Sequence, residues 1–539
     1  MKVHREVEVD RCYRGRGHAP SMSAPAYINR DLCNITLLFG DKALMKNRVL
    51  QRTATGLDGL DNILCGGLAS HRMYLLDGSP GVGKTTLAMQ FLMEGARRGE
   101  RCLYVTLSET REELEDVALS HGWSLEGIDV IELSQVENLF RASTQNTLFQ
   151  PSEVELTGLS DLLVREFDRL KPRRMVLDSL SEMRLMAQNP LRYRRQILAF
   201  KSHFATSDCT TLLLDDRSAS GQDAQVHSIV HGMITMQTVP LKFGINRRFL
   251  SISKMRGSMF REGNHDYVIK RGGIVVFPRL VAADHIVETR NELFPSGNAG
   301  LDRVCGGGLD AGTGSLFIGP AGSGKSTIAS MFASRAARDG HRVLYFSFDE
   351  TTGILLHRAR SMGIDFDGPL AAGNLVLRQI DPAEIAPGEL ANEIIAGIAR
   401  DNVRMVVLDS LNGYVNAMPQ EDYLHLHLHE LLTYLNQQGV ATIMVLAQHG
   451  LVGAMGAPVD VSYLADTVLL TRFFEARGAM RKAVSVIKKR SGAHEDTIRE
   501  ISLTSTGVRV GDPLVEFEGV MTGVPRFLGG DLVAASAGR

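Results

Sequence analysis

Short apolar runs rich in β-branched residues alternate along most of this chain with stretches whose apolar positions recur at helical spacing. This alternation is typical of βαβ units, in which helices cover a mostly parallel sheet. Successive strand patterns near 248–254, 267–269 and 274–277 predict that each unit ends in an antiparallel portion. The pattern therefore predicts an α/β fold. The expected central strands are 73–76, 102–107, 174–177 and 210–214, and then 316–318, 343–348, 405–408 and 441–446.

These two sets of strands belong to a long internal repeat. GLDNILCGGL at 59–68 matches GLDRVCGGGL at 300–309, and CLYVTLSET matches VLYFSFDET at the same offset, which is also the separation of Lys84 from Lys325. RMVLDSL then matches MVVLDSL, and ISKMRGS matches VIKKRSG, at slightly shorter offsets. Self-similarity of this length indicates a duplicated structural unit with small deletions in its loops.

The composition is that of a folded protein with more than one core. The chain has 539 residues, of which 44% are hydrophobic and 22% are charged. Its formal net charge of −2 provides no overall field that would favour nucleic acid or an anionic membrane. The expected parts are a flexible leader at 1–50, a first α/β domain at 51–285, a second at 286–525 and a flexible tail at 526–539.

The cysteines and the apolar runs limit the compartment. Six cysteines are scattered without a CxxC pair, which argues against a disulfide framework and a zinc site and fits a reducing environment. No apolar run approaches the roughly 18 residues of a membrane span, and no apolar segment follows the basic start. We therefore expect a cytoplasmic protein without a membrane partner.

Two glycine-rich stretches, GSPGVGKT at 78–85 and GPAGSGKS at 319–326, satisfy G-x-x-x-x-G-K-[ST] between an apolar strand and a helix. In this motif, backbone N–H groups and a helix N-terminus face a phosphate, and the lysine contacts the β- and γ-phosphates. A chance glycine-rich turn is a poor explanation for two copies in register, so we expect ATP at both. The expected phosphate-binding residues are Gly78, Ser79, Pro80, Gly81, Val82, Gly83, Lys84, Thr85 and Thr86, and Gly319, Pro320, Ala321, Gly322, Ser323, Gly324, Lys325, Ser326 and Thr327.

The same loops predict a metal site. Thr85 and Ser326 would ligate Mg²⁺ through their hydroxyl groups. Asp178 and Asp409 each end a buried apolar run, where a carboxylate would support the metal. The alternative for both aspartates is the N-cap of the helix that follows.

Hydrolysis needs a carboxylate that orients or deprotonates the attacking water. Glu109 and Glu350 stand in the expected place after the second strand of each unit, and Asp349 adds a carboxylate where the first unit has Ser108. These three acids are the catalytic candidates, and the two units would differ in how strongly they activate a nucleophile. The alternative is helix capping, since SETREEL resembles a capping box.

Over about 53–525 the chain resembles the KaiC family of RecA-type ATPases, the double-domain clock proteins and their bacterial relatives. The resemblance rests on GLDGLDNILCGGL, both phosphate loops, VTLSET and FSFDET, both LDS stretches, KMRG and ADTVLLTRFFEARGAMRKAVSVIKKRSGAHEDTIREI. It implies two tandem RecA-like P-loop domains that assemble into a homo-hexameric ring with ATP between protomers, and regulatory proteins as further partners.

The resemblance also implies that basic residues act across the protomer boundary. Lys254 and Arg256, and likewise Lys488 and Arg490, would reach the γ-phosphate held by the next subunit, as an arginine finger does. The alternative is a solvated basic turn at the end of a strand. The family carries paired glutamates where this chain has Ser108 and Asp349, which leaves the catalytic strength of the first unit open.

In the clock proteins the second domain phosphorylates itself on neighbouring Ser and Thr residues. Aligning ADT places Ser462 on the Ser position and Tyr463 on the Thr position. Ser462 is therefore the expected phosphoacceptor, while a cycle on Ser and Thr cannot run here. The alternative for DVSYLADT at 460–467 is an ordinary strand entrance.

Two weaker patterns remain open. HLHLHE at 425–430 places two histidines four residues apart, as a metal site would, but an exposed helix is the better explanation. Polar residues after the last central strands, Asp215 and Asp216 in one unit and Gln448 and His449 in the other, could sense the γ-phosphate or begin loops.

The sequence supports three functions of different classes. The first is an ATPase with serine/threonine autokinase activity in its second domain, acting in signalling or clock-like regulation. The second is a RecA-like DNA-dependent ATPase, which the near-neutral charge, the little spare sequence and the full second ATPase unit disfavour. The third is a nucleotide-sensing scaffold with vestigial hydrolysis, which Ser108 keeps open.

Overall fold

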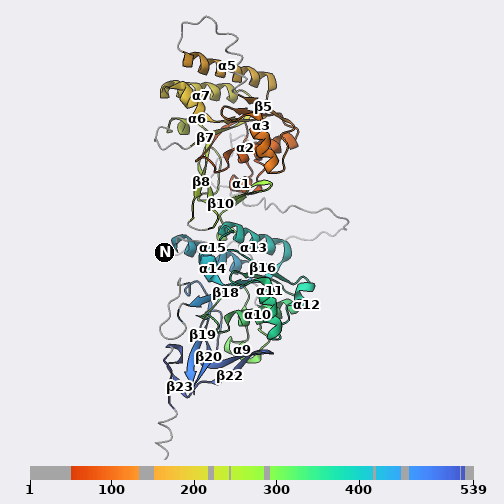
Figure 1. The fold of residues 1–539 in the computed structure, drawn as a ribbon, viewed down its shortest axis with the longest axis vertical. Coiled ribbons are helices and arrows are strands. Elements are labelled where there is room, and N and C mark those ends of the chain that lie inside the picture. The colour runs from red at the N-terminus through yellow and green to blue at the C-terminus, as the bar shows by residue number, and fades with distance from the viewer. Residues whose placement is uncertain are drawn as a thin grey trace, which may run out of the picture. The chain divides into compact units, whose positions relative to one another are not determined.

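The computed structural model describes residues 50–132, 151–216, 224–241, 244–284, 292–416, 421–448, 450, 461–476, 478–522 and 524–528. The expected leader at 1–50, except for Leu50, lies outside these residues, as does most of the expected tail. Two α/β domains follow one another along the chain, and each has helices on both faces of a large sheet (Figure 1).

A nine-stranded sheet forms the centre of the first domain, in the order β11-β10-β9-β8-β3-β7-β6-β4-β5. Its six strands from β8 to β5 are parallel, and β9, β10 and β11 are antiparallel. The strands are β3 (Met73–Gly78), β4 (Cys102–Thr106), β5 (Ile128–Glu132), β6 (Arg174–Asp178), β7 (Thr210–Asp216), β8 (Gly232–Val239), β9 (Arg247–Met255), β10 (His265–Lys270) and β11 (Gly273–Phe277).

Alternate residues of the central strands face two separate helical layers. Tyr74 and Leu76 of β3 pack in the cluster that holds α2, whereas Met73 and Leu75 pack in the cluster that holds α6 and α7. Near-continuous apolar strands are the consequence, because a parallel sheet is buried on both faces. The helices are α1 (Asp58–Ile63), α2 (Lys84–Arg97), α3 (Arg111–Ser120), α5 (Pro151–Leu170), α6 (Leu180–Ala187), α7 (Pro190–Ala205) and α8 (Ala224–Ile229), and a short ladder joins β1 (Arg52–Thr53) to β2 (Leu68–Ala69).

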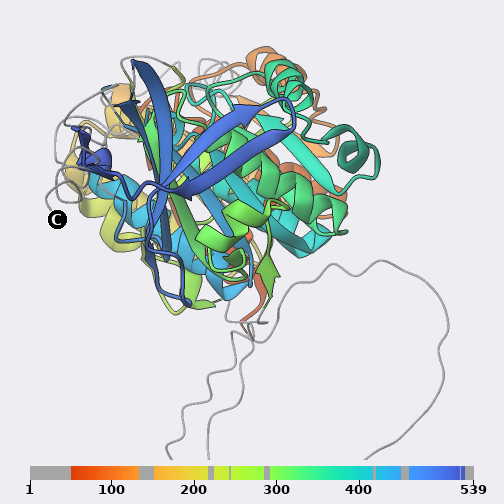
Figure 2. The same cartoon turned by 90° about the horizontal axis from the view of Figure 1, so that it is seen from below.

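The second domain repeats this architecture with the order β16-β15-β17-β18-β14-β19-β20-β21-β22. The antiparallel strands β20, β21 and β22, in dark blue, continue the parallel part of the sheet (Figure 2). The strands are β14 (Gly314–Pro320), β15 (Arg342–Ser347), β16 (Leu375–Gln379), β17 (Val403–Asp409), β18 (Ala441–Gln448), β19 (Thr467–Ala476), β20 (Ala479–Lys489), β21 (Arg499–Thr504) and β22 (Gly507–Pro513).

Helices of the second domain again form two layers. One core cluster contains α9, α10 and α11, and the other contains α13, α14 and α15. The helices are α9 (Ala299–Val304), α10 (Lys325–Arg338), α11 (Thr352–Ser361), α12 (Asp367–Ala371), α13 (Pro387–Asp401), α14 (Leu411–Asn416) and α15 (Glu421–Gln437). Short elements complete the described chain: β12 (Leu293–Phe294), β13 (Leu309–Asp310), β23 (Phe517–Glu518), β24 (Arg526–Phe527) and the 3-10 turns η2 (Ala282–Asp284) and η3 (Val520–Thr522).

The predicted α/β fold of two tandem domains is confirmed. All eight expected central strands form, with ends within two residues of the expected ones, and each unit does end in antiparallel strands. Within the residues described, no helix combines the length and apolarity that crossing a membrane requires.

Candidate functional site

In each domain the phosphate-binding loop connects the central strand to the longest helix of one layer. The loop after β3 leads into α2, and the loop after β14 leads into α10, with a left-handed glycine directly before each helix. Gly83 has φ 98° and Gly324 has φ 104°. The positive φ of Gly83 favours glycine there, whereas the nearest atom to an added Cβ, Cδ1 of Ile269 at 2.7 Å, is the end of a flexible side chain. The loops therefore present backbone N–H groups at a helix N-terminus, as a phosphate site does.

The loop lysines are buried but their surroundings differ. Lys84 donates to the carbonyl oxygens of Gly78 (2.9 Å) and Ser79 (3.1 Å) and pairs with the carboxylate of Asp216 at 2.6 Å. Lys325 donates to the carbonyl of Pro320 (2.7 Å), and burial lowers the pKa of its ammonium to about 8.

A hydroxyl, a carboxylate and a tyrosine recur together beside each loop. Thr85 donates to Oδ2 of Asp178 at 3.1 Å, and Tyr104 donates to the same oxygen at 2.6 Å. In the second domain, Ser326 donates to Oδ1 of Asp409 at 2.9 Å, and Tyr345 donates to Oδ2 at 2.6 Å.

Burial raises the pKa of both aspartates, and the hydroxyl donors partly oppose that rise. Asp178 uses its carboxylate on Thr85 and Tyr104, and the N-cap of α6 is Ser179, which accepts no side-chain hydrogen bond there. The capping alternative thus does not describe the observed contacts of Asp178.

These groups fit a magnesium ion. A hydroxyl and a carboxylate within hydrogen-bond distance of each other, next to a phosphate loop, are the hard oxygen donors that Mg²⁺ takes alongside nucleotide phosphates. Thr85 with Asp178, and Ser326 with Asp409, would hold the ion.

The acids after the second strand take different partners in the two domains. Oε2 of Glu109 is buried and has no hydrogen-bond partner within the described chain, and burial, reinforced by Asp178, raises its pKa. Glu350 instead accepts from Arg358 at 2.7 Å, and Asp349 accepts a short hydrogen bond from Ser410.

Helix capping at these positions is performed by neighbouring residues. Thr110 and Glu113 form the capping box of α3, and Thr351 caps α11. The capping signal in SETREEL is therefore real, but it lies one residue beyond Glu109. The carboxylate of Glu109 is therefore not used to cap α3.

The four basic residues that the sequence singled out, Lys254, Arg256, Lys488 and Arg490, lie near one end of the central strands. The phosphate loop of the same domain lies at the other end of these strands. The N–H of Arg256 donates to the carbonyl of His231, and the N–H of His231 donates to the carbonyl of Met73, five residues before Gly78. Five strand residues span roughly 16 Å, which an arginine side chain does not bridge. Arg256 therefore has no access to the phosphate loop of its own domain. Its guanidinium and the ammonium of Lys254 donate instead to carbonyls of α8.

The second domain repeats this separation. The N–H of Arg490 donates to the carbonyl of Asp466, whose own N–H donates to Gly314 at the start of β14, five residues before Gly319. Lys488 donates to the carbonyls of Ser462 (3.1 Å) and Ala465 (2.6 Å). The basic pair thus holds the turn that contains Ser462.

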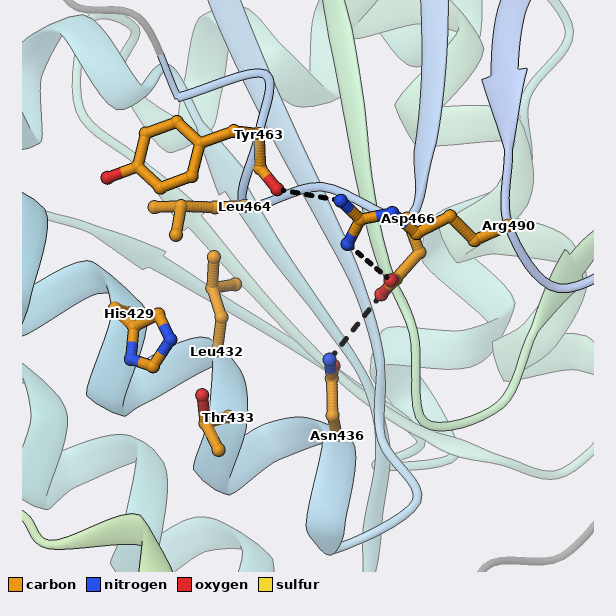
Figure 3. Close-up of a pocket in the computed structure, with 8 residues that line it drawn as sticks. All are labelled: His429, Leu432, Thr433, Asn436, Tyr463, Leu464, Asp466 and Arg490. Atoms are coloured by element: carbon orange, nitrogen blue, oxygen red, sulfur yellow. Dashed lines mark hydrogen bonds and ion pairs between the residues drawn. The ribbon is translucent and has the colours of Figure 1, made fainter.

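This turn borders a pocket of about 280 Å³. In Figure 3 the guanidinium of Arg490 lies between the carbonyl of Tyr463 (3.3 Å) and the carboxylate of Asp466 (3.6 Å). His429 and Asn436 line the opposite wall from α15. Ser462 is half-buried and Tyr463 is exposed, and β19 begins only at Thr467, so the stretch is a turn before a strand.

Two of the weaker patterns are changed by the structure. No group of three or more metal-ligating side chains occurs within the residues described, and His427 bonds to Tyr414 (2.6 Å) rather than to the other histidines. Asp216 and Gln448 are the last residues of β7 and β18, and each still pairs in the sheet ladder. His449 lies outside the described residues.

Sequence reasoning missed Tyr104, Tyr345 and Arg358. The two tyrosines recur at the same offset as the loop lysines, inside CLYVTLSET and VLYFSFDET, so the repeat contained the signal that could have found them. Arg358 has Val117 as its counterpart at that offset, so nothing in the repeat marked it.

Known proteins resemble this chain over both domains. The family model for the KaiC ATPase matches residues 53–281 and 294–515. A circadian clock oscillator protein KaiC of Prochlorococcus marinus (strain MIT 9313) is 26% identical over 481 residues, which cover 88% of this chain and 96% of that protein. The protein of the same name from Thermostichus vulcanus is 27% identical over 497 residues, covering 88% of this chain and 92% of the relative.

Proposed function

The chain belongs to the KaiC family of ATPases, and from this premise we propose that it is an ATP-hydrolysing ring protein whose second domain phosphorylates itself. The proposal includes ATP and Mg²⁺ in both domains, a cytoplasmic homo-hexamer and regulatory protein partners. It places the protein in signalling or clock-like regulation.

The observation that carries the ring is the separation of the basic residues from the phosphate loops. Arg256 and Arg490 each lie level with the start of the strand whose far end carries the loop. A neighbouring subunit that presents its loop to this edge would complete the site, and the added positive charge would stabilise the transferring phosphoryl group. A single chain would therefore be nearly inactive.

In the first domain, the loop N–H groups and Lys84 would bind the phosphates, and Thr85 with Asp178 would hold the metal. Magnesium, when bound, neutralises charge on the β- and γ-phosphates. Glu109 would accept a proton from the attacking water, a task that its raised pKa and unpartnered Oε2 suit. Lys254 and Arg256 of the neighbour would complete the site.

In the second domain, the acceptor would be the hydroxyl of Ser462 from the neighbouring chain. Its oxygen would form a bond to the γ-phosphorus while the bond to the β–γ bridging oxygen breaks and ADP leaves. The proton would pass to Asp349 or Glu350. Since Lys488 donates to the carbonyl of Ser462, the acceptor turn and the basic pair would approach the nucleotide together.

Incubation of the purified chain with γ-labelled ATP and Mg²⁺ tests this function. Label on the protein supports the autokinase, and release of labelled phosphate supports the ATPase. Ser462→Ala should remove the label, as should Glu350→Gln if Glu350 rather than Asp349 accepts the proton. Ser505→Ala, which changes an exposed serine beside a threonine on another turn of the same domain, should keep the label. Label that persists in Ser462→Ala refutes the acceptor assignment, and turnover that requires DNA supports a RecA-like DNA-dependent ATPase instead.

One observation favours a nucleotide-sensing scaffold as the second candidate. Ser108 replaces a carboxylate beside Glu109, so the first domain has one acid where the second has two. Binding of ATP without label or phosphate release in the same assay would support that function.

A further inference from the structure

We propose that Asp216 competes with nucleotide phosphates for Lys84 and so weakens nucleotide binding to the first domain. The inference rests on the proposed binding of nucleotides at both loops, and it concerns how the two loops differ. Its ligands are nucleoside di- and triphosphates, because these carry the phosphates that the loop lysine contacts.

Asp216 is held next to the loop by the sheet. It is the last residue of β7 and lies opposite Gly78 in the parallel ladder between β3 and β7. Its backbone N–H donates to Oγ of Ser181 in α6 (3.2 Å), which fixes the end of the strand. The carboxylate is 42% exposed, so it can leave Lys84 without breaking the core.

The ammonium of Lys84 has three partners, one for each of its N–H groups. A lysine has three N–H donors. Two of them go to the carbonyls of Gly78 and Ser79, and the ion pair with Asp216 at 2.6 Å takes the third. A phosphate must therefore displace the carboxylate before it can bind the lysine, and the displaced carboxylate stays nearby as a like charge.

The second domain lacks this competitor. The residue opposite Gly319 in the equivalent ladder is Ala447, where the first domain has Asp216. Lys325 donates to the carbonyl of Pro320 and makes no ion pair with a carboxylate in the described part of the chain. The second loop consequently accepts a phosphate without an exchange of partners. Asp216 would therefore weaken nucleotide binding to the first loop by a contribution that the second loop lacks.

The test is calorimetric titration of the full chain with ADP, in EDTA and again in Mg²⁺. Lys325→Ala should abolish ADP binding at the second phosphate loop, so the titration then measures ADP binding at the first loop alone. In that background Asp216→Asn keeps the shape of the side chain and should tighten ADP binding about fivefold in both buffers, since a partly exposed ion pair is being released. Asp208→Asn removes the same charge from an exposed aspartate that pairs with His71 and Arg173, and should leave the affinity unchanged.

The converse substitution makes the result independent of any defect in one variant. In a Lys84→Ala background, Ala447→Asp should weaken ADP binding to the second loop about fivefold. Unchanged or weaker binding in Asp216→Asn overturns the inference, as does an equal gain in Asp208→Asn. Weaker binding in Mg²⁺ alone would make Asp216 a metal ligand, which also overturns it. If neither Lys325→Ala nor its Asp216→Asn derivative binds ADP, the proposed nucleotide site itself fails.

Discussion

Replacing Tyr345 by Phe removes one hydroxyl from the nucleotide site of the second domain and nothing else. Tyr345 is fully buried, and its hydroxyl donates to Oδ2 of Asp409 at 2.6 Å, while Ser326 donates to Oδ1. The ring keeps its place and no cavity forms. The substitution therefore removes a hydrogen bond to the carboxylate that would help to hold Mg²⁺, together with a longer contact at 3.5 Å to the hydroxyl of Ser330.

The expected cost follows from the charge of the acceptor. A hydrogen bond to a charged group contributes about 1.5–3 kcal/mol, against about 1 kcal/mol for a neutral pair. Burial already raises the pKa of Asp409, and loss of the tyrosine donor raises that pKa further. We expect Tyr345→Phe to lower the free energy of unfolding of the second domain by about 2 kcal/mol. The Mg²⁺ needed for half-maximal turnover should rise roughly tenfold or more, as for other residues that orient a metal ligand.

Mg²⁺ titration of ATP turnover measures the second effect in chains that also carry Lys84→Ala, so that only the second domain contributes to turnover. Urea unfolding of the same chains, compared with and without Tyr345→Phe, measures the first effect. Tyr414→Phe is the control, because it deletes another buried hydroxyl of the same domain, bonded to His427 rather than to a carboxylate. It should change stability but not the Mg²⁺ requirement. A Tyr345→Phe chain with wild-type stability and wild-type Mg²⁺ dependence refutes the hydrogen-bonded arrangement.

Two further predictions concern assembly and acidity. In a Lys84→Ala background, chains with Lys325→Ala and chains with Arg490→Ala should each be inactive. Mixing the two should restore roughly a quarter of the second-domain rate, because about a quarter of the interfaces then combine an intact loop with an intact arginine. No recovery on mixing would contradict the proposal that Arg490 acts across the subunit boundary. Burial lowers the pKa of His427 to about 4, so the unfolded chain takes up a proton below pH 6.5 that the folded chain does not. The free energy of unfolding should therefore fall by about 1.4 kcal/mol more between pH 7.5 and 5.5 in the wild type than in His427→Gln, and equal slopes in urea unfolding would contradict it.

The strands and loops were predictable because their signals are local. Apolar runs that are buried on both faces mark the parallel strands, and the glycine pattern marks the turn before α2 and α10. The internal repeat then joined the loops to Asp178 and Asp409, which the structure places beside Thr85 and Ser326. Each of these steps needs only the order of residues along the chain.

The remaining features depend on register and on side-chain partners. The sequence did not show which residues correspond at the ends of β7 and β18, because only the ladder shows that Asp216 corresponds to Ala447. The ion pair of Arg358 with Glu350 breaks the repeat and so left no pattern to detect. The distance of Arg490 from its own loop likewise follows from the strand ladder and not from spacing in the sequence.

The central claim is that each domain binds one nucleotide at its own loop. Equilibrium dialysis with labelled ATP and Mg²⁺ counts the nucleotides bound per chain in the wild type, in Lys84→Ala, in Lys325→Ala and in the double variant. The account predicts two, one, one and none. A wild-type chain that binds a single nucleotide, or a double variant that still binds ATP at wild-type affinity, would contradict it.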